Sequence, residues 1–285
     1  MPNILKKLTR RRIMNMPELP TLPDNVIKLM HMLRDPDVSA PDVIDEINRD
    51  HVLVAQILKL VNSGYYSIRT HVSTVDHAVS LVGFVKVWEL IASSSVMAII
   101  SGREPALWKH SYATSVLLRD IIEAEKVRCS PELQLTGLMH DIGKIVLLQY
   151  DAEKYRRAGA LSAKEQIPSH AAEERVLHVN HAEVGGWLLE AWDLDEEQVS
   201  PIAEHHVDTP PTKWAVEVGL LQIADYCDCH VRGQPATPPS QDLLIEAGLT
   251  GLDWEGKWLP AHEQAVEQHD AVHDEQDDAA CDSTT

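Results

Sequence analysis

The chain has 285 residues, 44% of them hydrophobic, which suffices for one large or two small domains with a substantial core. The 44 acidic and 25 basic residues give a formal charge of −19, which opposes attraction to nucleic acids and anionic lipid, so we expect neither partner. No apolar run has the length of a membrane span, the basic N-terminus lacks the apolar segment of a secretory signal, and the four cysteines form no CxxC pair. These features predict a cytoplasmic protein with reduced thiols.

The first 105 residues show helical periodicity. A basic stretch, residues 1–16, comes first, and we expect it to be a solvated, frayed arm. A proline-rich entry segment, residues 17–23, cannot start inside a helix. Apolar stripes then predict successive helices, with Ser39 as one N-cap, which run from Asp24 to Asp35, from Ser39 to about Ile47, from Val52 to Val61, from Val75 to Gly83 and from about Val85 to Ile100. No strand alternation is evident.

The second half begins near Ala106 and carries polar groups on otherwise apolar helix faces. His110 shares a face with Leu117 and Ile121, so it should point toward packed structure. Ser130 and Pro131 give a start signal for the helix that delivers His140 and Asp141 beside a core-facing stripe. Residues 151–178 are rich in Ala and charged residues and are expected to form an exposed helix plus a loop.

Three further segments bring polar groups to apolar faces. His181 leads a helix whose Gly185 and Gly186 permit another backbone to approach closely. The pair His205 and His206 ends a helix with at least one ring pointing inward. Asp225 stands on the apolar stripe of a helix over residues 214–228, an unusual position for a carboxylate.

Each of these groups alone is better explained as a hydrogen-bonded buried side chain, but together they predict a shared site. Five successive helices supply the candidate metal ligands, which are His110, His140, Asp141, His181, His205, His206 and Asp225. Imidazoles and carboxylates that converge between helices can hold one or two divalent ions, and these donors suit Fe, Mn, Zn or Ni. Lys144, just past Gly143, is placed to neutralise a phosphate. The alternative without metal is a buried hydrogen-bond network that holds the helices in register.

The chain resembles a known family at several separate motifs in one order. His110, His140-Asp141 and Asp225 look like the HD superfamily of metal-dependent phosphohydrolases. Further segments are similar to the HDOD family, the HD-related output domain of bacterial signalling, and these are Leu19-Pro20-Thr21-Leu22-Pro23, Arg49-Asp50, residues 60–66, residues 78–83, residues 108–111 and residues 137–144. The resemblance runs from about Pro17 to about Asp228.

The resemblance implies an all-α, two-lobed fold. We expect an HDOD domain over residues 17–232, with an N-terminal helical lobe over 17–105 and an HD-like lobe over 106–232. A linker and helical extension over 233–260 should follow. The acidic residues 261–285 lack Lys and Arg and are expected to be disordered.

The resemblance leaves two functions open. The first is a regulatory output module that acts through a signalling partner or a small nucleotide. The second is a metal-dependent phosphohydrolase, with Asp141 and Lys144 as catalytic residues. Residues 145–150 stand where cyclic-di-GMP phosphodiesterases carry Gly-Tyr-Pro, which argues against that substrate. The sequence does not fix the oligomeric state.

Overall fold

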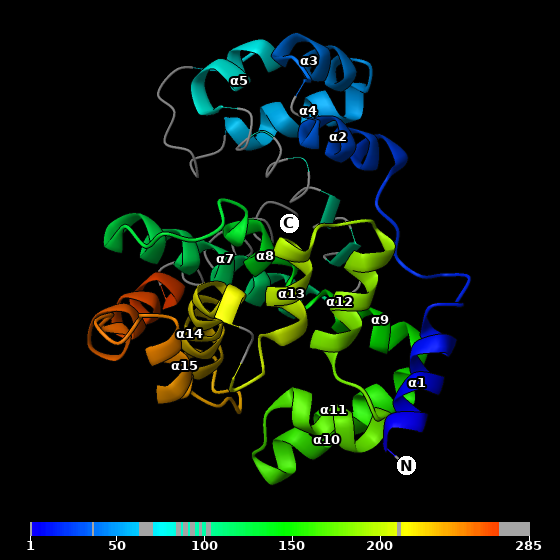
Figure 1. Ribbon diagram of the computed structural model, residues 1–285, viewed down its shortest axis with the longest axis vertical. Helices are drawn as coiled ribbons and strands as arrows, with labels where there is room; N and C mark the ends of the chain where they lie inside the picture. The colour runs from blue at the N-terminus through cyan, green and yellow to red at the C-terminus, as the bar shows by residue number, and fades with distance from the viewer. Residues whose placement is uncertain are drawn as a thin grey trace, which may run out of the picture. The chain divides into compact units, whose positions relative to one another are not determined.

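The computed structural model describes residues 2–35, 37–62, 71–83, 104–209 and 212–267, together with positions 87, 91, 95, 96, 99 and 100. These residues form helices and connecting segments, and none of them lies in a strand, which confirms the all-α prediction (Figure 1). No helix in this part of the chain is long and apolar enough to cross a membrane. The chain divides into two compact units, residues 20–105 and residues 1–19 with 106–285.

The first unit contains four described helices with ordinary local signals. They are α2 (Asp24–Arg34), α3 (Ala40–Asn48), α4 (His51–Val61) and α5 (Val75–Val82). Ser39 caps α3 in a capping box with Asp42, and α5 ends at Gly83, whose φ of 81° favours glycine. Residues 63–66, which belong to the motif at residues 60–66, and most of the predicted helix over residues 85–100 lie outside the described residues.

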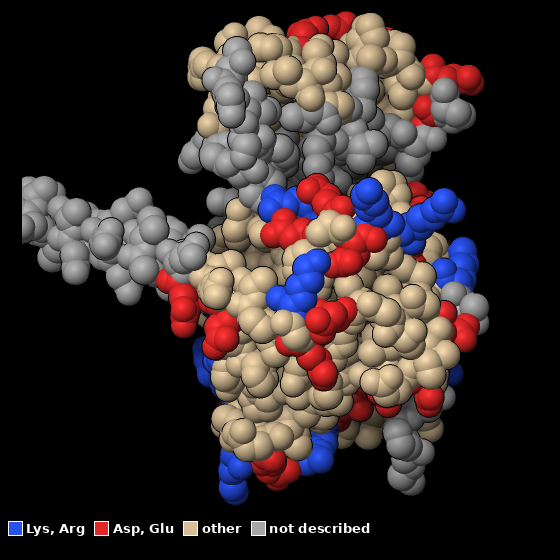
Figure 2. All heavy atoms as spheres, turned by 90° about the vertical axis from the view of Figure 1, so that its left-hand side faces the viewer, with Lys and Arg blue, Asp and Glu red and all other residues tan. Residues whose placement is uncertain are grey.

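The second unit is made of helices, several of which share one large apolar cluster. Its elements are α1 (Pro2–Ile13), α7 (Pro105–Glu125), α8 (Leu133–Met139), α9 (Ile142–Tyr150), α10 (Ala152–Glu165), α11 (Ser169–Leu177), α12 (His181–Ala191), α13 (Glu196–Glu204), η2 (Thr212–Trp214), α14 (Ala215–Val231), α15 (Gln241–Glu246) and the π-helix η3 (Trp254–Trp258). Side chains of α7, α14, α15 and η3 share that cluster. On the face drawn in Figure 2, the described Lys and Arg side chains lie beside Asp and Glu rather than in a separate basic patch.

The basic N-terminal stretch differs from the sequence prediction. It forms α1, in which Ile13 has no exposed surface and whose basic side chains form ion pairs with α12. Lys6 pairs with Glu183, and Arg10 lies 2.6 Å from Glu190. Partners on α12 therefore order a segment that was expected to be frayed.

The C-terminal end also differs from the prediction. Residues 259–267, which include the start of the predicted disordered tail, continue as helix after η3. His262 is only 5% exposed. Trp254 and Trp258 in the apolar cluster anchor this segment.

Candidate metal centre

His140 and Asp141 lie in a break between two helices. The sequence predicted a helix starting at Ser130 and Pro131, but α8 begins at Leu133 and ends at Met139, and α9 begins at Ile142. The break is fully buried, with His140 at 0% and Asp141 at 1% exposure. Both side chains therefore leave the backbone at a turn rather than from a helix face.

Gly143 allows the start of α9 to touch the start of α12. A Cβ at this position would lie 2.0 Å from the carbonyl oxygen of His181 and 2.7 Å from the backbone nitrogen of Gly185. No side chain fits so close to backbone. The approach places Asp141 Oδ1 3.1 Å from His181 Nε2.

The first group of candidate ligands joins α7, the His140 turn and α14. One nitrogen or oxygen atom each of His110, His140 and Asp225 lies within 4.8 Å of the others. His110 Nε2 is 3.1 Å from His140 Nε2 and 3.2 Å from Asp225 Oδ1. Asp141 Oδ2 adds a fourth donor 3.3 Å from His110 Nε2.

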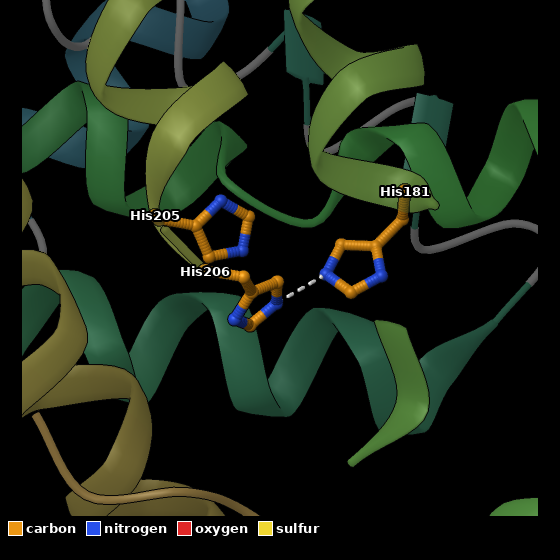
Figure 3. Close-up of side chains that lie close together, drawn as sticks. All are labelled: His181, His205 and His206. Atoms are coloured by element: carbon orange, nitrogen blue, oxygen red, sulfur yellow. Dashed lines mark hydrogen bonds between the residues drawn. The ribbon is translucent and has the colours of Figure 1, made fainter. Parts of the chain in front are cut away.

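The second group joins the start of α12 to the end of α13. His181, His205 and His206 converge there (Figure 3), again within 4.8 Å. His181 Nε2 lies 2.9 Å from His206 Nε2, and the rings of His205 and His206 have centroids 4.0 Å apart. Both rings of the pair thus reach the site, and His205 is the fully buried one. Asp141 faces both groups, one through each carboxylate oxygen.

Four of the histidines have one ring nitrogen held by an acceptor outside the groups. His110 Nδ1 donates to Asp228 Oδ2 at 2.7 Å, and His140 Nδ1 donates to the Gly137 carbonyl at 2.7 Å. His181 Nδ1 donates to Glu173 Oε2 at 2.7 Å, and His205 Nδ1 donates to the Ile202 carbonyl at 2.6 Å. A neutral ring with its proton on Nδ1 presents a lone pair on Nε2. All four lone pairs then point into the site, as metal-ligating histidines with fixed tautomers do.

The charges of the site favour a cation. Four carboxylates border it, Asp141, Glu173, Asp225 and Asp228, against two cationic side chains, Lys144 and Arg232, so two negative charges remain when the histidines are neutral. Burial alone raises the pKa of Asp141, but Lys144 and the neighbouring histidines hold it well below its ordinary value. Asp225 has a lowered pKa for similar reasons, because His110 and His140 outweigh its burial. The carboxylates are therefore charged at neutral pH.

The histidine nitrogens fit the same conclusion. Burial and neighbouring rings hold the pKa values of His205 and His206 well below the ordinary value, so both are neutral. Burial alone would lower the pKa of His110, yet its bonds to Asp141, Asp225 and Asp228 raise it well above 6.5, so without metal its ring carries a second proton, whose place a metal ion can take. Two Nε2 lone pairs facing each other at 3.1 Å repel unless a proton or metal ion lies between them. Two buried atoms of the candidate ligands, His205 Nε2 and Asp141 Oδ1, have no hydrogen-bond partner among the described residues. These residues fit a divalent ion.

The structure adds residues that the sequence prediction missed. Glu173, 2% exposed, lies in the segment expected to be an exposed helix plus loop, yet its Oε2 accepts bonds from both Nδ1 and the backbone N–H of His181. Asp228 bonds His110, Arg232 and His262. An acidic residue on an apolar helix face was the signal that found Asp225. The same signal marks Glu173, one turn before the buried Leu177, and Asp228, one turn after Asp225.

The motif Cys227-Asp228-Cys229-His230 supplies no metal ligand among the described groups. Cys227 is part of the apolar cluster, and burial raises the pKa of its thiol to about 12. Cys229 lies 3.4 Å from Asp225 Oδ1.

A cavity of about 190 Å³ opens onto the centre. Its walls include residues of both ligand groups and Lys144, whose Nζ lies 2.6 Å from Asp141 Oδ2. The far wall comes from Ser169, His170 and residues 235–238. His170 stacks on His206 with ring centroids 4.0 Å apart.

The fold and the convergent histidines and aspartates define a helical protein with a candidate metal centre. The HDOD domain model matches residues 19–207, about two thirds of the chain, and the protein belongs to the HDOD domain family. A curated relative, an uncharacterized protein of Treponema pallidum (strain Nichols), is 26% identical over 193 residues. The alignment spans 66% of this chain but only 38% of that relative.

Solved structures agree on the fold. An HDOD domain protein of unknown function from Geobacter sulfurreducens has a TM-score of 0.72 at 26% identity, with 96% of each chain covered. A candidate signal transduction protein from Marinobacter aquaeolei VT8 has a TM-score of 0.74 at 19% identity, covering 94% of this chain and 64% of that one. A candidate phosphohydrolase from Shewanella amazonensis SB2B has a TM-score of 0.67 at 20% identity, covering 91% and 97%.

Proposed function

We propose that the protein is a regulatory HDOD output module whose second unit holds one or two divalent metal ions. The observation that carries the proposal is the set of four histidine Nε2 atoms that converge with Asp141 and Asp225 while each Nδ1 is bonded elsewhere. A buried network without metal would use both nitrogens of each ring, yet His205 Nε2 has no partner among the described residues. Nitrogen and oxygen donors favour Fe, Mn, Zn or Ni.

The regulatory part of the proposal rests on the number of helices that the candidate ligands join. Its ligands come from five separate places in the second unit, namely α7, the turn before α9, the start of α12, the end of α13, and α14. Binding at such a point changes the relative stability of packing states in every attached helix. The cavity is smaller than ligand pockets of roughly 300 Å³ and above. A compact phosphorylated ligand, or inorganic phosphate, fits this cavity beside Lys144. A signalling protein would recognise the resulting change in the packing of the attached helices.

The test of this function starts with metal analysis of protein purified without added metal. We expect a stoichiometric transition metal in the wild type and a lower metal content in His140→Ala, which lacks a ligand of the first group. A wild type without metal, which also takes up none when Mn or Fe is added, would contradict the proposal. A pull-down with the metal-loaded protein should recover a partner that the His140→Ala protein does not bind.

A second candidate function is metal-dependent phosphoester hydrolysis. The cavity favours it, because Asp141, Lys144, His205, His206 and Asp225 all border one opening. An ion bound there would supply Lewis acidity toward a phosphoryl oxygen and lower the pKa of a bound water. Lys144 stands 2.6 Å from Asp141, where its charge would steady a phosphate, and Glu173 and Asp228 would keep two histidines in place.

Hydrolysis is tested separately by a screen of small phosphomonoesters and nucleotides with added Mn or Fe. The hydrolase proposal predicts turnover that disappears in Asp141→Ala. Turnover of equal size in Asp141→Ala would identify a contaminant. Metal binding without turnover would leave the regulatory function as the better account.

A further inference from the structure

We propose that the C-terminal segment, residues 254–267, supports the metal centre, with His262 as a positioning residue for His110. This inference rests on the proposed metal-binding function. His262 Nε2 donates to Asp228 Oδ1 at 2.9 Å, and Asp228 Oδ2 accepts from His110 Nδ1 at 2.7 Å. The contacts form a chain from the C-terminal helix to a candidate ligand.

The Asp228 carboxylate is held in one orientation by three hydrogen-bond donors. Asp228 is fully buried, and Arg232 Nε adds a third donor, 2.6 Å from Oδ2. Burial would raise the pKa of Asp228, but the bonds from His110, His262 and Arg232 hold it well below its ordinary value. Among these donors only His262 engages Oδ1, so its loss leaves one buried carboxylate oxygen unsatisfied and free to seek another partner.

Turning Asp228 would move His110. The ring of His110 has its Nδ1 fixed by Asp228, and this bond aims its Nε2 at Asp225 and His140. Partners of this kind set the affinity of a metal site although they do not touch the metal. The second ligand group, around His181, uses Glu173 for the same purpose and has no contact with His262 in the described structure.

Contacts of residues other than His262 hold this segment in place, so a substitution of His262 should not displace it. Trp254 and Trp258 lie in the apolar cluster, and Lys257 Nζ lies 2.5 Å from Glu125 Oε1. Asp228, Arg232 and His262 all lie beyond residue 207, where the family match ends. The support therefore belongs to the part of this chain outside the matched domain.

The experiment compares Mn²⁺ and Zn²⁺ binding by the full-length wild type, His262→Ala, His262→Gln and the exposed control Gln264→Ala. Competition with a chelating indicator gives the affinities, and circular dichroism of the metal-free proteins monitors folding. We expect His262→Ala to weaken the first ligand group about tenfold. His262→Gln, whose amide nitrogen can donate to the same oxygen, should restore binding to within about threefold, and Gln264→Ala should match the wild type.

Two results would overturn the inference alone: wild-type affinity in His262→Ala, or equal loss in the Ala and Gln variants while both keep their helical signal. If His262→Ala does not fold, the Gln variant decides alone: metal affinity within about threefold of the wild type supports the inference, and a larger loss with the helical signal kept overturns it. A wild type that binds neither metal would overturn the proposed function and this inference together.

Discussion

Asp141 is the residue on which the two ligand groups depend, because each of its carboxylate oxygens faces one group. We predict that Asp141→Asn removes metal from both groups. Loss of the charge also leaves Lys144 without its ion-pair partner, which should lower the free energy of unfolding of the metal-free protein by about 1–3 kcal/mol. Elemental analysis and urea denaturation give the two quantities.

The control for that substitution is Asp225→Asn, since Asp225 belongs to the first group only. It should retain metal in the second group. Equal metal content in Asp141→Asn and the wild type would contradict the bridging position of Asp141.

A second prediction at residue scale concerns Cys129, a partly buried thiol away from the centre. Burial and the nearby Glu217 carboxylate raise its pKa to about 11, so the thiol stays protonated at pH 8. A raised pKa means less thiolate, and we expect alkylation at pH 8 to be roughly a hundredfold slower than for a free thiol of pKa about 8.5. The rate should rise about tenfold per pH unit toward pH 11.

Pulsed iodoacetamide labelling followed by mass spectrometry of the peptide that contains Cys129 measures this rate, with the urea-unfolded chain as the reference. Equal rates in the folded and unfolded chains would show that the thiol is not in this environment.

The sequence predicted candidate ligands better than their supports. His110 and Asp225 stand on apolar stripes whose period is visible in the sequence, and the structure brings them within hydrogen-bond distance. Glu173 and His262 escaped prediction because their partners, His181 and Asp228, lie 8 and 34 positions away along the chain, and only tertiary folding pairs them. Their role toward a metal remains a prediction.

At the scale of elements, the contact between α9 and α12 is set by Gly143. We predict that Gly143→Ala forces these helix starts apart, because the added methyl group would meet backbone at 2.0 Å. Both the free energy of unfolding and the metal affinity should fall, the former by about 2 kcal/mol or more. Gly159→Ala in α10, where a Cβ meets nothing within 4 Å, is the matched control. It should leave the metal affinity unchanged and raise the free energy of unfolding by up to about 1 kcal/mol, because alanine favours the helix. Thermal denaturation and metal titration measure the pair.

The N-terminal helix supplies another prediction at this scale. Ile13 has no exposed surface, so Ile13→Ala should lower the free energy of unfolding by about 2–4 kcal/mol. The exposed pair of Arg10 and Glu190 should contribute less than about 1 kcal/mol, so Glu190→Ala serves as the comparison. Urea denaturation that shows no effect of Ile13→Ala would mean that α1 does not dock on this unit.

Local signals account for part of the element pattern only. Ser39 begins α3 and Gly83 ends α5 where the sequence predicted. The break at His140 and Asp141 was not predicted, because the apolar stripe continues from Leu138 to Ile142 without a breaker. Likewise, nothing in the charged residues 1–16 indicates a docking surface, since the surface is provided by α12.

At the scale of the molecule, repeated apolar stripes without strand alternation were enough to predict an all-α chain. Metal binding should stabilise the folded state, because the ligand groups are assembled only in the folded chain. With free metal at 100 times the dissociation constant, we expect about 2.7 kcal/mol of stabilisation. Differential scanning calorimetry with and without a chelator tests this, and Asp141→Asn should show no difference between the two conditions.

The most direct measurement is anomalous X-ray scattering from crystals of the full-length protein grown with Mn²⁺. The account predicts an anomalous peak within coordination distance of His110, His140 and Asp225, and a second peak, where two ions bind, beside His181, His205 and His206. Strong Mn peaks elsewhere in the crystal with none at either group would contradict the metal centre.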